Sequence, residues 1–525
     1  MRGFRYSATL FAGAAVLALT FTSCAGTAGS APPAGAPAGE LMRVATGAIA
    51  KSVDPAAELS ASYLRAHGAA EALMRITPEG KVVPELAEKM EATAPAEWTV
   101  QLRKGATFSS GAPVDAAAVV ASLTRSRKLN SLAQGQLKNV TIEASGTDKV
   151  TFKTPSPQPE LPFALAHYQT VIYNASLLAP DAVGGVDPAA SDLSGPYRIK
   201  DFTTDRTMVL EANGSWWGGR PKLKTVEVRQ VTDHQARAQL ALSAQADIVQ
   251  DIPSDRAKEL QQSQAVQLVD VPAANTVAAY LNPSSAIAPA LADVRVRQAL
   301  GWGVDRKELV ELATNSLTTP SPSWLASNPG YPDAAATGFT SYDPVRAAEL
   351  LDDAGWTMED GKRQKDGKPF VLRLLTFGAE AATGEVLQAQ WGKLGIDVQV
   401  QNVESTLITQ AIKNGNWDAA TQAWTTVGSA STLIAGQAAP DGAGNHSKLA
   451  IPGIEELLKT AAAAGNAQER SDALLEVNRL MTEYVPSVPL HPRVVATAVS
   501  SKVSGFTAHP LQYGQLITGD VGISK

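Results

Sequence analysis

The chain has 525 residues, of which 44% are hydrophobic and 18% are charged, and its formal net charge is −6. This length exceeds what one hydrophobic core usually serves, so we expect two or more lobes. The composition excludes general disorder, and the mildly acidic charge excludes a broad electrostatic surface for nucleic acid. Cys24 is the only cysteine, so no disulfide forms within the chain and its stability must come from its core.

The first residues predict export. Two arginines precede an apolar stretch, Thr9 to Thr20, that is too short to span a bilayer as a stable helix. The segment resembles a bacterial lipoprotein signal, which is cut before a cysteine that is then lipidated. Phe21 replaces the usual leucine, and a plain secretion signal with a chance cysteine is the alternative. We predict a signal peptide over residues 1–23 and a lipid on Cys24, which would hold the protein at the extracytoplasmic face of the cell membrane.

Short strands and amphipathic helices alternate after a flexible tether, which the Gly, Ala and Pro content predicts for residues 24–40. Strands are expected at 41–45, 98–102, 225–229, 278–281, 371–375 and 397–400. Helices are expected at 63–74, 294–302, 344–354, 383–394, 454–463 and 467–484, with a further one opening after the N-cap Asp115. This alternation predicts an α/β fold.

Catalytic motifs are missing from the sequence. It contains no phosphate-binding loop, no H-E-x-x-H zinc motif and no G-x-S-x-G nucleophile motif. None of its six histidines pair at helical spacing, which disfavours a metal site built on one helix. We therefore expect neither a metal nor a cofactor, and no enzymatic activity.

A series of short motifs follows a familiar order along the chain. They are Ser52–Pro55, Gly80–Ala87, Trp98–Gly105, Phe108–Gly111, Ser194–Tyr197, Asn213–Lys224, Val294–Leu300, Val304–Arg306, Tyr342–Pro344, Leu394–Ile396 and Pro486–Leu490. Together they resemble the family 5 extracellular solute-binding proteins, the peptide/nickel class of receptors for bacterial ABC importers. Arg297 and Asp305 belong to these motifs, and either an ion pair between them or a binding role would explain them.

The resemblance implies a two-lobed α/β fold like that of periplasmic binding proteins, with a hinge and an inserted subdomain in the first lobe. Lobe I would comprise residues 41–282, with the inserted subdomain at about 69–192, and lobe II residues 283–491. Residues 492–525 would return to lobe I. The hinge crossings would fall at Tyr280–Pro283 and Pro492–Ala496.

The resemblance also implies a function. A monomeric receptor would close its lobes around a solute and deliver it to the transmembrane subunits of an ABC permease. Oligopeptides are the favoured ligands because they are frequent in the family. A glycoside, an opine-like conjugate or a chelated metal is the alternative. An exported α/β hydrolase is a remote alternative, because nucleophile motifs are missing.

Aromatic residues near segments that line the cleft in the family are candidate ligand contacts. Trp424 and Thr425 end a predicted strand, where peptide-binding members follow a tryptophan with an acid that holds the ligand's α-amine. Here that position falls on Val427, so Glu404 or another acid would have to take this role, or the ligand would lack a free amine. The remaining candidates are Tyr63, Tyr280 and Tyr331.

Overall fold

The computed structural model describes residues 40–185, 187–326, 328, 331–378, 380–425, 429–511 and 514–524. The predicted signal peptide, Cys24 and all but the last residue of the predicted tether lie outside this part of the chain. Ala38–Lys525 form one compact unit. In the described ranges, no helix combines the length and the apolar character needed to cross a membrane.

A ten-stranded sheet runs through both halves of this unit. Its strands in spatial order are β10 (Tyr197–Thr203), β11 (Thr207–Ala212), β12 (Thr225–Gln230), β1 (Leu41–Thr46), β13 (Ile248–Val249), β21 (Ser487–Ser500), β14 (Val266–Leu281), β20 (Ala419–Thr425), β18 (Val371–Thr376) and β19 (Asp397–Asn402). We call the half with β1 and β10–β13 lobe I, and the half with β18–β20 lobe II.

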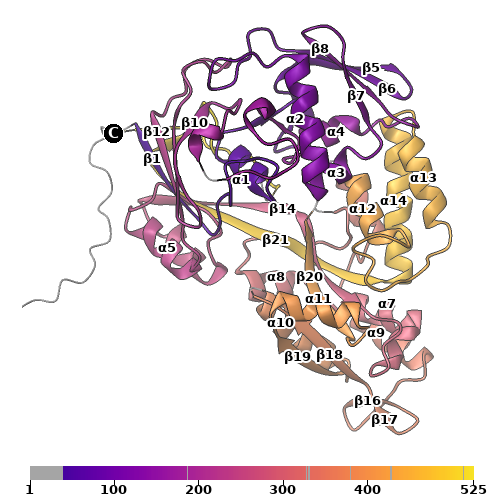
Figure 1. Cartoon of the computed structure of the whole chain (residues 1–525). Helices are drawn as coiled ribbons and strands as arrows, with labels where there is room; N and C mark the ends of the chain where they lie inside the picture. Colours follow the sequence, from indigo (N-terminus) through magenta and orange to yellow (C-terminus); the bar gives the residue numbers. More distant parts are fainter. Residues whose placement is uncertain are drawn as a thin grey trace, which may run out of the picture. The chain divides into compact units, whose positions relative to one another are not determined.

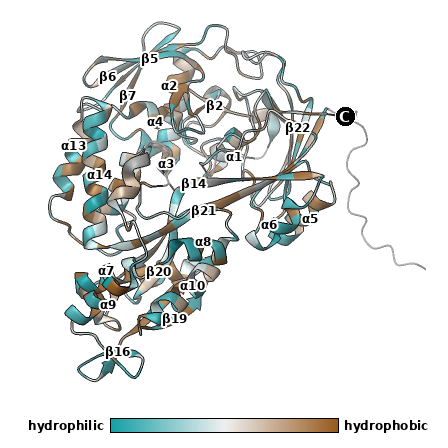
Figure 2. Cartoon of the chain, turned by 180° about the vertical axis from the view of Figure 1, so that it is seen from behind, coloured by the Kyte–Doolittle hydropathy of each residue, from teal (hydrophilic) through white to brown (hydrophobic). Residues whose placement is uncertain are grey.

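Two long antiparallel strands, β14 and β21, extend from one lobe into the other (Figure 1). In lobe I they pair from Val266↔Ser500 to Pro272↔Val494, and in lobe II pairing resumes at Thr276↔Pro492. The register shifts between these two stretches, so the sheet is irregular where it passes between the lobes. Strand β21 is buried except near its middle, and hydrophobic residues predominate in its lobe I part from Val494 on (Figure 2). The lobe boundary predicted near residue 282 lies farther along β14 and stays a prediction.

The parallel strands of both lobes end at this crossing. In lobe I, β1 is parallel to β12 and β13, and β13 and β14 are both antiparallel to β21, so all four run toward the crossing. In lobe II, β20 starts at Ala419 opposite Leu281 and ends at Thr425 opposite Asn275. Strands β18 and β19 run in the same direction as β20. Ligands of open α/β sheets bind outside the carboxyl ends of the strands, and here both sets of carboxyl ends face one place.

The inserted subdomain is a separate layer of sheet and helices on lobe I. Its sheet is β5 (Ala87–Ala94), β6 (Glu97–Leu102), β8 (Lys149–Lys153) and β7 (Thr141–Ala144), and its helices are α2 (Ala116–Leu129), α3 (Ser131–Gln136) and α4 (Leu161–Ala166). The buried faces of β6, β8 and α2 form its core. Asp115 caps α2 as predicted, because its carboxylate accepts the Ala118 amide at 2.8 Å.

Helices cover both faces of the main sheet. In lobe I, α1 (Ser60–Ala66) packs into the core on one face, and α5 (His234–Leu242) and α6 (Ala257–Gln261) form a second core. In lobe II, the first core contains α7 (Val294–Trp302), α8 (Arg306–Thr314), α9 (Pro344–Asp353) and α10 (Glu380–Lys393). The second contains α11 (Ser405–Lys413), α12 (Ala430–Ala438), α13 (Ile454–Ala463) and α14 (Ala467–Tyr484).

Short strands complete the structure. They are β2 (Glu71–Ala72) with β9 (Val171–Ile172), β3 (Met74–Ile76) with β4 (Val82–Pro84), β22 (Val503–Ser504) with β23 (Gly522–Ile523), and the sheet of β15 (Thr357–Glu359), β16 (Lys362–Lys365) and β17 (Lys368–Pro369). The predicted helices 294–302, 454–463 and 467–484 are confirmed with the same bounds as α7, α13 and α14.

The helix predicted over residues 63–74 is wrong. Helix α1 ends at Ala66, and the chain turns at Gly68, whose φ is +80°. The Gly68 amide donates to the Arg65 carbonyl and the Ala69 amide donates to the Leu64 carbonyl, which is the Schellman pattern that ends helices. A Cβ at Gly68 would lie 2.7 Å from the Ile517 carbonyl oxygen, so packing against the C-terminal segment requires glycine here.

The ion pair considered for Arg297 and Asp305 does not form. The Arg297 guanidinium donates to main-chain carbonyls, with Nη2 2.8 Å from the Tyr484 oxygen and Nη1 2.8 Å from the Leu291 oxygen. Asp305 instead caps α8 by accepting the amides of the next turn. Both residues therefore serve the scaffold, through contacts with the backbone.

Candidate ligand-binding site

The loops at the carboxyl ends of the parallel strands form the candidate site. On the side of lobe I, Arg237 of α5 holds these loops in place. Its Nη1 lies 2.6 Å from the Val231 oxygen, and its Nε lies 3.1 Å from the Gln250 oxygen. These carbonyls follow β12 and β13, the two strands that flank β1, so one buried guanidinium fixes the ends of both. Burial lowers the pKa of Arg237, and the side chain supports the site from behind.

Helix α1 begins after the loop that follows β1 and carries two polar groups of interest. Ser62 is buried, and its hydroxyl accepts a hydrogen bond of 2.8 Å from Nε2 of Gln169 in the inserted subdomain. The Oε1 atom of Gln169 is buried without a hydrogen-bond partner in the described part of the chain. Tyr63 packs partly buried against the core of lobe I.

Asn275 lies in the irregular stretch of β14 between the lobes. Its side chain is buried, with 2% of its surface exposed. Neither its Nδ2 nor its Oδ1 has a hydrogen-bond partner among the described residues. Its neighbour Ala274 donates a backbone hydrogen bond of 2.9 Å to the Pro510 carbonyl, which brings the C-terminal segment to the crossing. A buried amide without partners costs free energy, which a ligand that supplies both a donor and an acceptor would recover.

The predicted contacts of lobe II gather around α12. Trp424 is partly buried and lies in van der Waals distance of Gly436, where an added Cβ would be 3.7 Å from its ring. Thr425 ends β20. Val427, where the family acid would fall, lies outside the described residues.

Tyr280 lies behind this region and is buried in a core. Its hydroxyl donates to Oε1 of Gln437 at 2.8 Å, and its ring packs at a tilt of 55° against His446, with 4.8 Å between the centroids. Burial raises the pKa of Tyr280 and lowers the pKa of His446 to about 4. In this arrangement Tyr280 supports α12 from within lobe II, and a direct contact with ligand stays a prediction.

Tyr331 lies near charged residues from both lobes. Burial and the charge of Glu160 raise its pKa, the charge of Arg470 lowers it, and together they bring it to about 12. Glu160 belongs to the inserted subdomain and Arg470 to α14, so charges from both lobes act on Tyr331. Glu404 is exposed at the start of α11, just after β19.

The structure thus brings Trp424, Thr425 and Tyr331 to the region around α12, places Tyr63 in the other lobe and leaves Glu404 at an exposed strand end. Their roles as ligand contacts stay predictions. Sequence reasoning missed Asn275, although an amide within the apolar run Ala273–Leu281 is a signal that could have indicated it.

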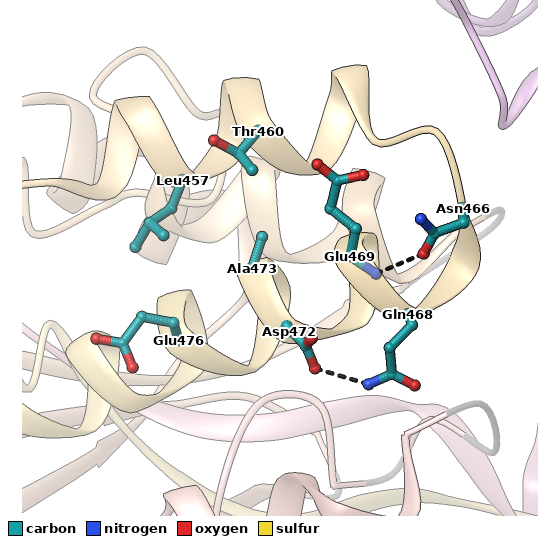
Figure 3. A pocket seen from close by; sticks show the side chains of 8 residues that line it. All are labelled: Leu457, Thr460, Asn466, Gln468, Glu469, Asp472, Ala473 and Glu476. Atoms are coloured by element: carbon teal, nitrogen blue, oxygen red, sulfur yellow. Dashed lines mark hydrogen bonds between the residues drawn. The ribbon is translucent and has the colours of Figure 1, made fainter.

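A groove of about 690 Å³ lies elsewhere on the surface, between α13 and α14 (Figure 3). Several of the polar side chains that line it already have hydrogen-bond partners. Nε2 of Gln468 donates to Asp472 at 2.8 Å, and Oδ1 of Asn466 accepts the Glu469 amide at 2.9 Å (Figure 3). All of these residues belong to one helix pair of one lobe, so this groove does not respond to lobe closure. The described residues contain no group of three or more His, Cys, Asp or Glu placed to hold a metal ion.

Two lobes linked by two long strands, with the carboxyl ends of both half-sheets facing the link, define the periplasmic-binding-protein fold. NikA from Brucella suis in complex with Fe(III)-EDTA has this fold, with a TM-score of 0.81 and 21% identity over 92% of this chain and 100% of that one. AppA from Bacillus subtilis in complex with a nonapeptide gives a TM-score of 0.72 and 20% identity over 92% and 99% of the two chains.

The sequence comparison identifies the family. Residues 81–442 match the bacterial extracellular solute-binding proteins, family 5 (middle region), and the chain belongs to this family. The glutathione-binding protein GsiB of Salmonella paratyphi A is 27% identical over 431 residues, which cover 79% of this chain and 81% of GsiB. The protein is therefore an extracytoplasmic substrate-binding protein of an ABC importer, and its family is not enzymatic. The hydrolase alternative is excluded by this membership.

Proposed function

We propose that the protein is a lipid-anchored receptor that binds oligopeptides between its lobes and delivers them to an ABC permease. The anchor would be Cys24, and residues 24–40 would be the tether that keeps the receptor near the permease. Tethering raises the effective concentration of one partner at the other without new contacts. A single acyl chain binds membranes only marginally, so stable anchoring needs the several chains of a bacterial lipoprotein.

Asn275 is the observation that carries the choice of a peptide ligand. A peptide group presents one N–H donor and one C=O acceptor, and an asparagine amide offers the complementary acceptor and donor. In this structure both atoms of the Asn275 amide are buried and unpaired among the described residues.

The relatives support the same ligand class. GsiB is named for binding glutathione, which is a peptide, and AppA was solved with a nonapeptide. Nickel-binding protein NikA of Staphylococcus aureus is 24% identical over 449 residues, covering 84% of this chain. Because of this relative, a chelated metal is the second candidate ligand.

Closure would occur by rotation about the irregular part of β14 and the facing part of β21. Between Pro272 and Thr276 the regular ladder is interrupted, and the chain passes between lobes only in these two strands of the sheet. Hinges are short segments that absorb backbone rotation while the packed lobes move as bodies. A ligand favours the closed state by contacting both lobes at once.

Calorimetry with a panel of di- to nonapeptides, reduced glutathione and the Ni(II)–histidine chelate tests the proposal. We expect a peptide to bind, Asn275→Ala to weaken it about tenfold, and Asn414→Ala, at an exposed asparagine of lobe II, to leave it unchanged. Small-angle scattering should show a smaller radius of gyration with the bound peptide. Binding of the nickel chelate alone would establish the second candidate instead.

A further inference from the structure

Glu160, which precedes α4 in the inserted subdomain, bonds to lobe II with both of its carboxylate oxygens. Its Oε2 accepts the Ser429 hydroxyl at 2.7 Å, and its Oε1 accepts the Ser431 hydroxyl at 2.9 Å. The guanidinium of Arg470 in α14 lies 4.0 Å from Oε1. We call Glu160, Ser429, Ser431 and Arg470 the lobe clasp.

The local structure of the subdomain does not explain this glutamate. Glu160 occupies the N-cap position of α4, yet its side chain makes no capping hydrogen bond to that helix. On the other side, Ser429 caps α12 by accepting the Thr432 amide, so the carboxylate approaches the N-terminus of a nine-residue helix. Negative charge is stabilised there by the helix dipole. The carboxylate thus fits the opposite lobe better than its own helix.

We propose that Glu160 is a closure-selective residue of the binding site, which stabilises the closed state by bonding to Ser429 and Ser431 and thereby sets how long a ligand is held. The inference rests on the hinge closure of the proposed function, but it does not depend on which ligand binds. Rotation that separates the lobes must break these bonds, because the partners belong to different lobes.

The clasp is also adjacent in sequence to the predicted ligand contacts. Ser429 follows Trp424 and Thr425 by only a few residues, so a ligand that positions the end of β20 also bears on the N-terminus of α12. The same charges of Glu160 and Arg470 act on Tyr331. Ligand and clasp would therefore stabilise the same closed arrangement.

The expected effect is moderate because water reaches the clasp. The side chains of Glu160 and Arg470 are 21% and 16% exposed, so solvent screens their attraction and replaces the bonds after opening. We expect Glu160→Ala to lower the ratio of closed to open molecules about tenfold, which corresponds to about 1.4 kcal/mol. Since these bonds are absent from the open state, ligand dissociation should accelerate more than association slows.

Single-molecule fluorescence on ligand-free protein tests this. Because Cys24 is the only cysteine, a Cys24→Ser form can carry two dyes at Ala94→Cys in β5 and Lys459→Cys in α13, one on each side of the clasp. Glu160→Ala should lower the closed population if the parent is largely closed. Ser431→Arg, which offers Glu160 a direct ion pair, should raise it if the parent is largely open.

The controls separate the clasp from general effects. Glu385→Ala removes an exposed acid from α10 and should leave the ratio unchanged. Ser431→Arg should gain nothing in the Glu160→Ala background, because the partner is gone. The proposal is overturned if Glu160→Ala and Ser431→Arg both stay within twofold of the parent, or if Ser431→Arg acts equally without Glu160. The fluorescence experiment uses ligand-free protein. Its result therefore stands even if calorimetry finds no peptide that binds.

Discussion

The inserted subdomain is attached to lobe I by ion pairs buried from water, whereas it meets lobe II through a partly exposed glutamate. Toward lobe I, Arg125 pairs with Asp54 at 2.7 Å, and their side chains are 4% and 0% exposed. Arg65 pairs with Glu85 at 2.9 Å in a similarly buried setting. Toward lobe II, the clasp around Glu160 remains in contact with solvent.

The two interfaces also differ in how deeply their hydrogen-bonded carboxylates are buried. Asp54 accepts two bonds from Arg125 and further bonds from the Gly184 and Ala56 amides. Both oxygens of Glu71 accept indole N–H groups, one from Trp216 and one from Trp217, and burial and Glu85 raise the pKa of Glu71. In contrast, Glu160, which accepts one serine hydroxyl on each oxygen, has a side chain that is 21% exposed. Breaking a buried network is costly, whereas water can replace the bonds of an exposed carboxylate.

Removing the buried carboxylate of Asp54 should lower the free energy of unfolding more than any of the other substitutions. Burial alone would raise the pKa of Asp54, but hydrogen bonds from Arg125 and the backbone lower it overall, so the group is ionised in the folded protein. Asp54→Ala leaves the Arg125 charge buried and unpaired, and we expect the free energy of unfolding to fall by about 3–5 kcal/mol. Urea unfolding followed by circular dichroism measures this.

Asp181→Ala is the matched control, because Asp181 is an exposed acid that pairs with Lys128 of the same subdomain helix α2. It should change the free energy of unfolding by no more than about 0.5 kcal/mol. A loss below about 1 kcal/mol for Asp54→Ala would show that the two interfaces are not different in kind.

Lowering the pH should destabilise the protein, because two buried histidines near the interface between the subdomain and lobe I would have to take up protons. Burial lowers the pKa of His67 to about 4, and burial together with the charge of Arg65 lowers that of His167 to about 3. The unfolded chain binds these protons near pH 6.5 and the folded protein does not, so stability falls as the pH drops from about 6.5 toward 4. At pH 5 each histidine should account for about 2 kcal/mol.

Denaturant titrations of His167→Gln at pH 7 and pH 5 measure this contribution. The loss of stability between the two pH values should shrink by about 2 kcal/mol relative to the parent. His234→Gln, at an exposed histidine of α5, should show the parental pH dependence. Equal pH dependence of parent and His167→Gln would contradict the prediction.

A substitution in the lobe clasp should change the rate of ligand dissociation but hardly change the free energy of unfolding. Arg470→Ala removes a charge 4.0 Å from Glu160 and leaves the two serine hydrogen bonds in place. We expect ligand dissociation to accelerate about threefold, with the free energy of unfolding unchanged within about 0.5 kcal/mol. Stopped-flow dissociation and urea unfolding provide the pair of measurements. A loss of more than about 1 kcal/mol in the free energy of unfolding would contradict the prediction, because Arg470 would then stabilise the fold as the buried ion pairs with lobe I do.

The smallest effect is expected from blocking the ligand's amine. No acid occurs from Thr425 to Pro440 in the sequence, and the oxygens of Glu160 are already occupied by the serines. Acetylating a bound peptide should therefore cost less than about 1 kcal/mol, compared with about 3–5 for loss of a buried charge pair. Calorimetry on the free and acetylated peptides decides this. A hundredfold loss would mean that another acid, first of all Glu404, binds the amine.

Local signals predicted much of the fold. Asp115 caps α2 through its own next turn, and the bounds of α13 and α14 follow from apolar spacing that the neighbouring residues already contain. The helix expected over 63–74 failed because Gly68 must approach Ile517, a contact that no nearby residue reveals. Trp424 and Tyr331 carry a family signal and do lie around α12. Glu160 could not be found this way, because its partner Ser429 is 269 residues away.

The order of strands in the sheet also has a consequence for how the chain folds as it is made. β21 lies between β13 and β14, so the sheet of lobe I lacks an inner strand until residues near Val494–Ser500 have been synthesised. All strands of lobe II are available by about residue 491. Lobe II should therefore fold first, while lobe I waits with the edges of β13 and β14 unpaired. Such edges favour aggregation, so a chain truncated before Val494 should aggregate more readily than the full-length protein.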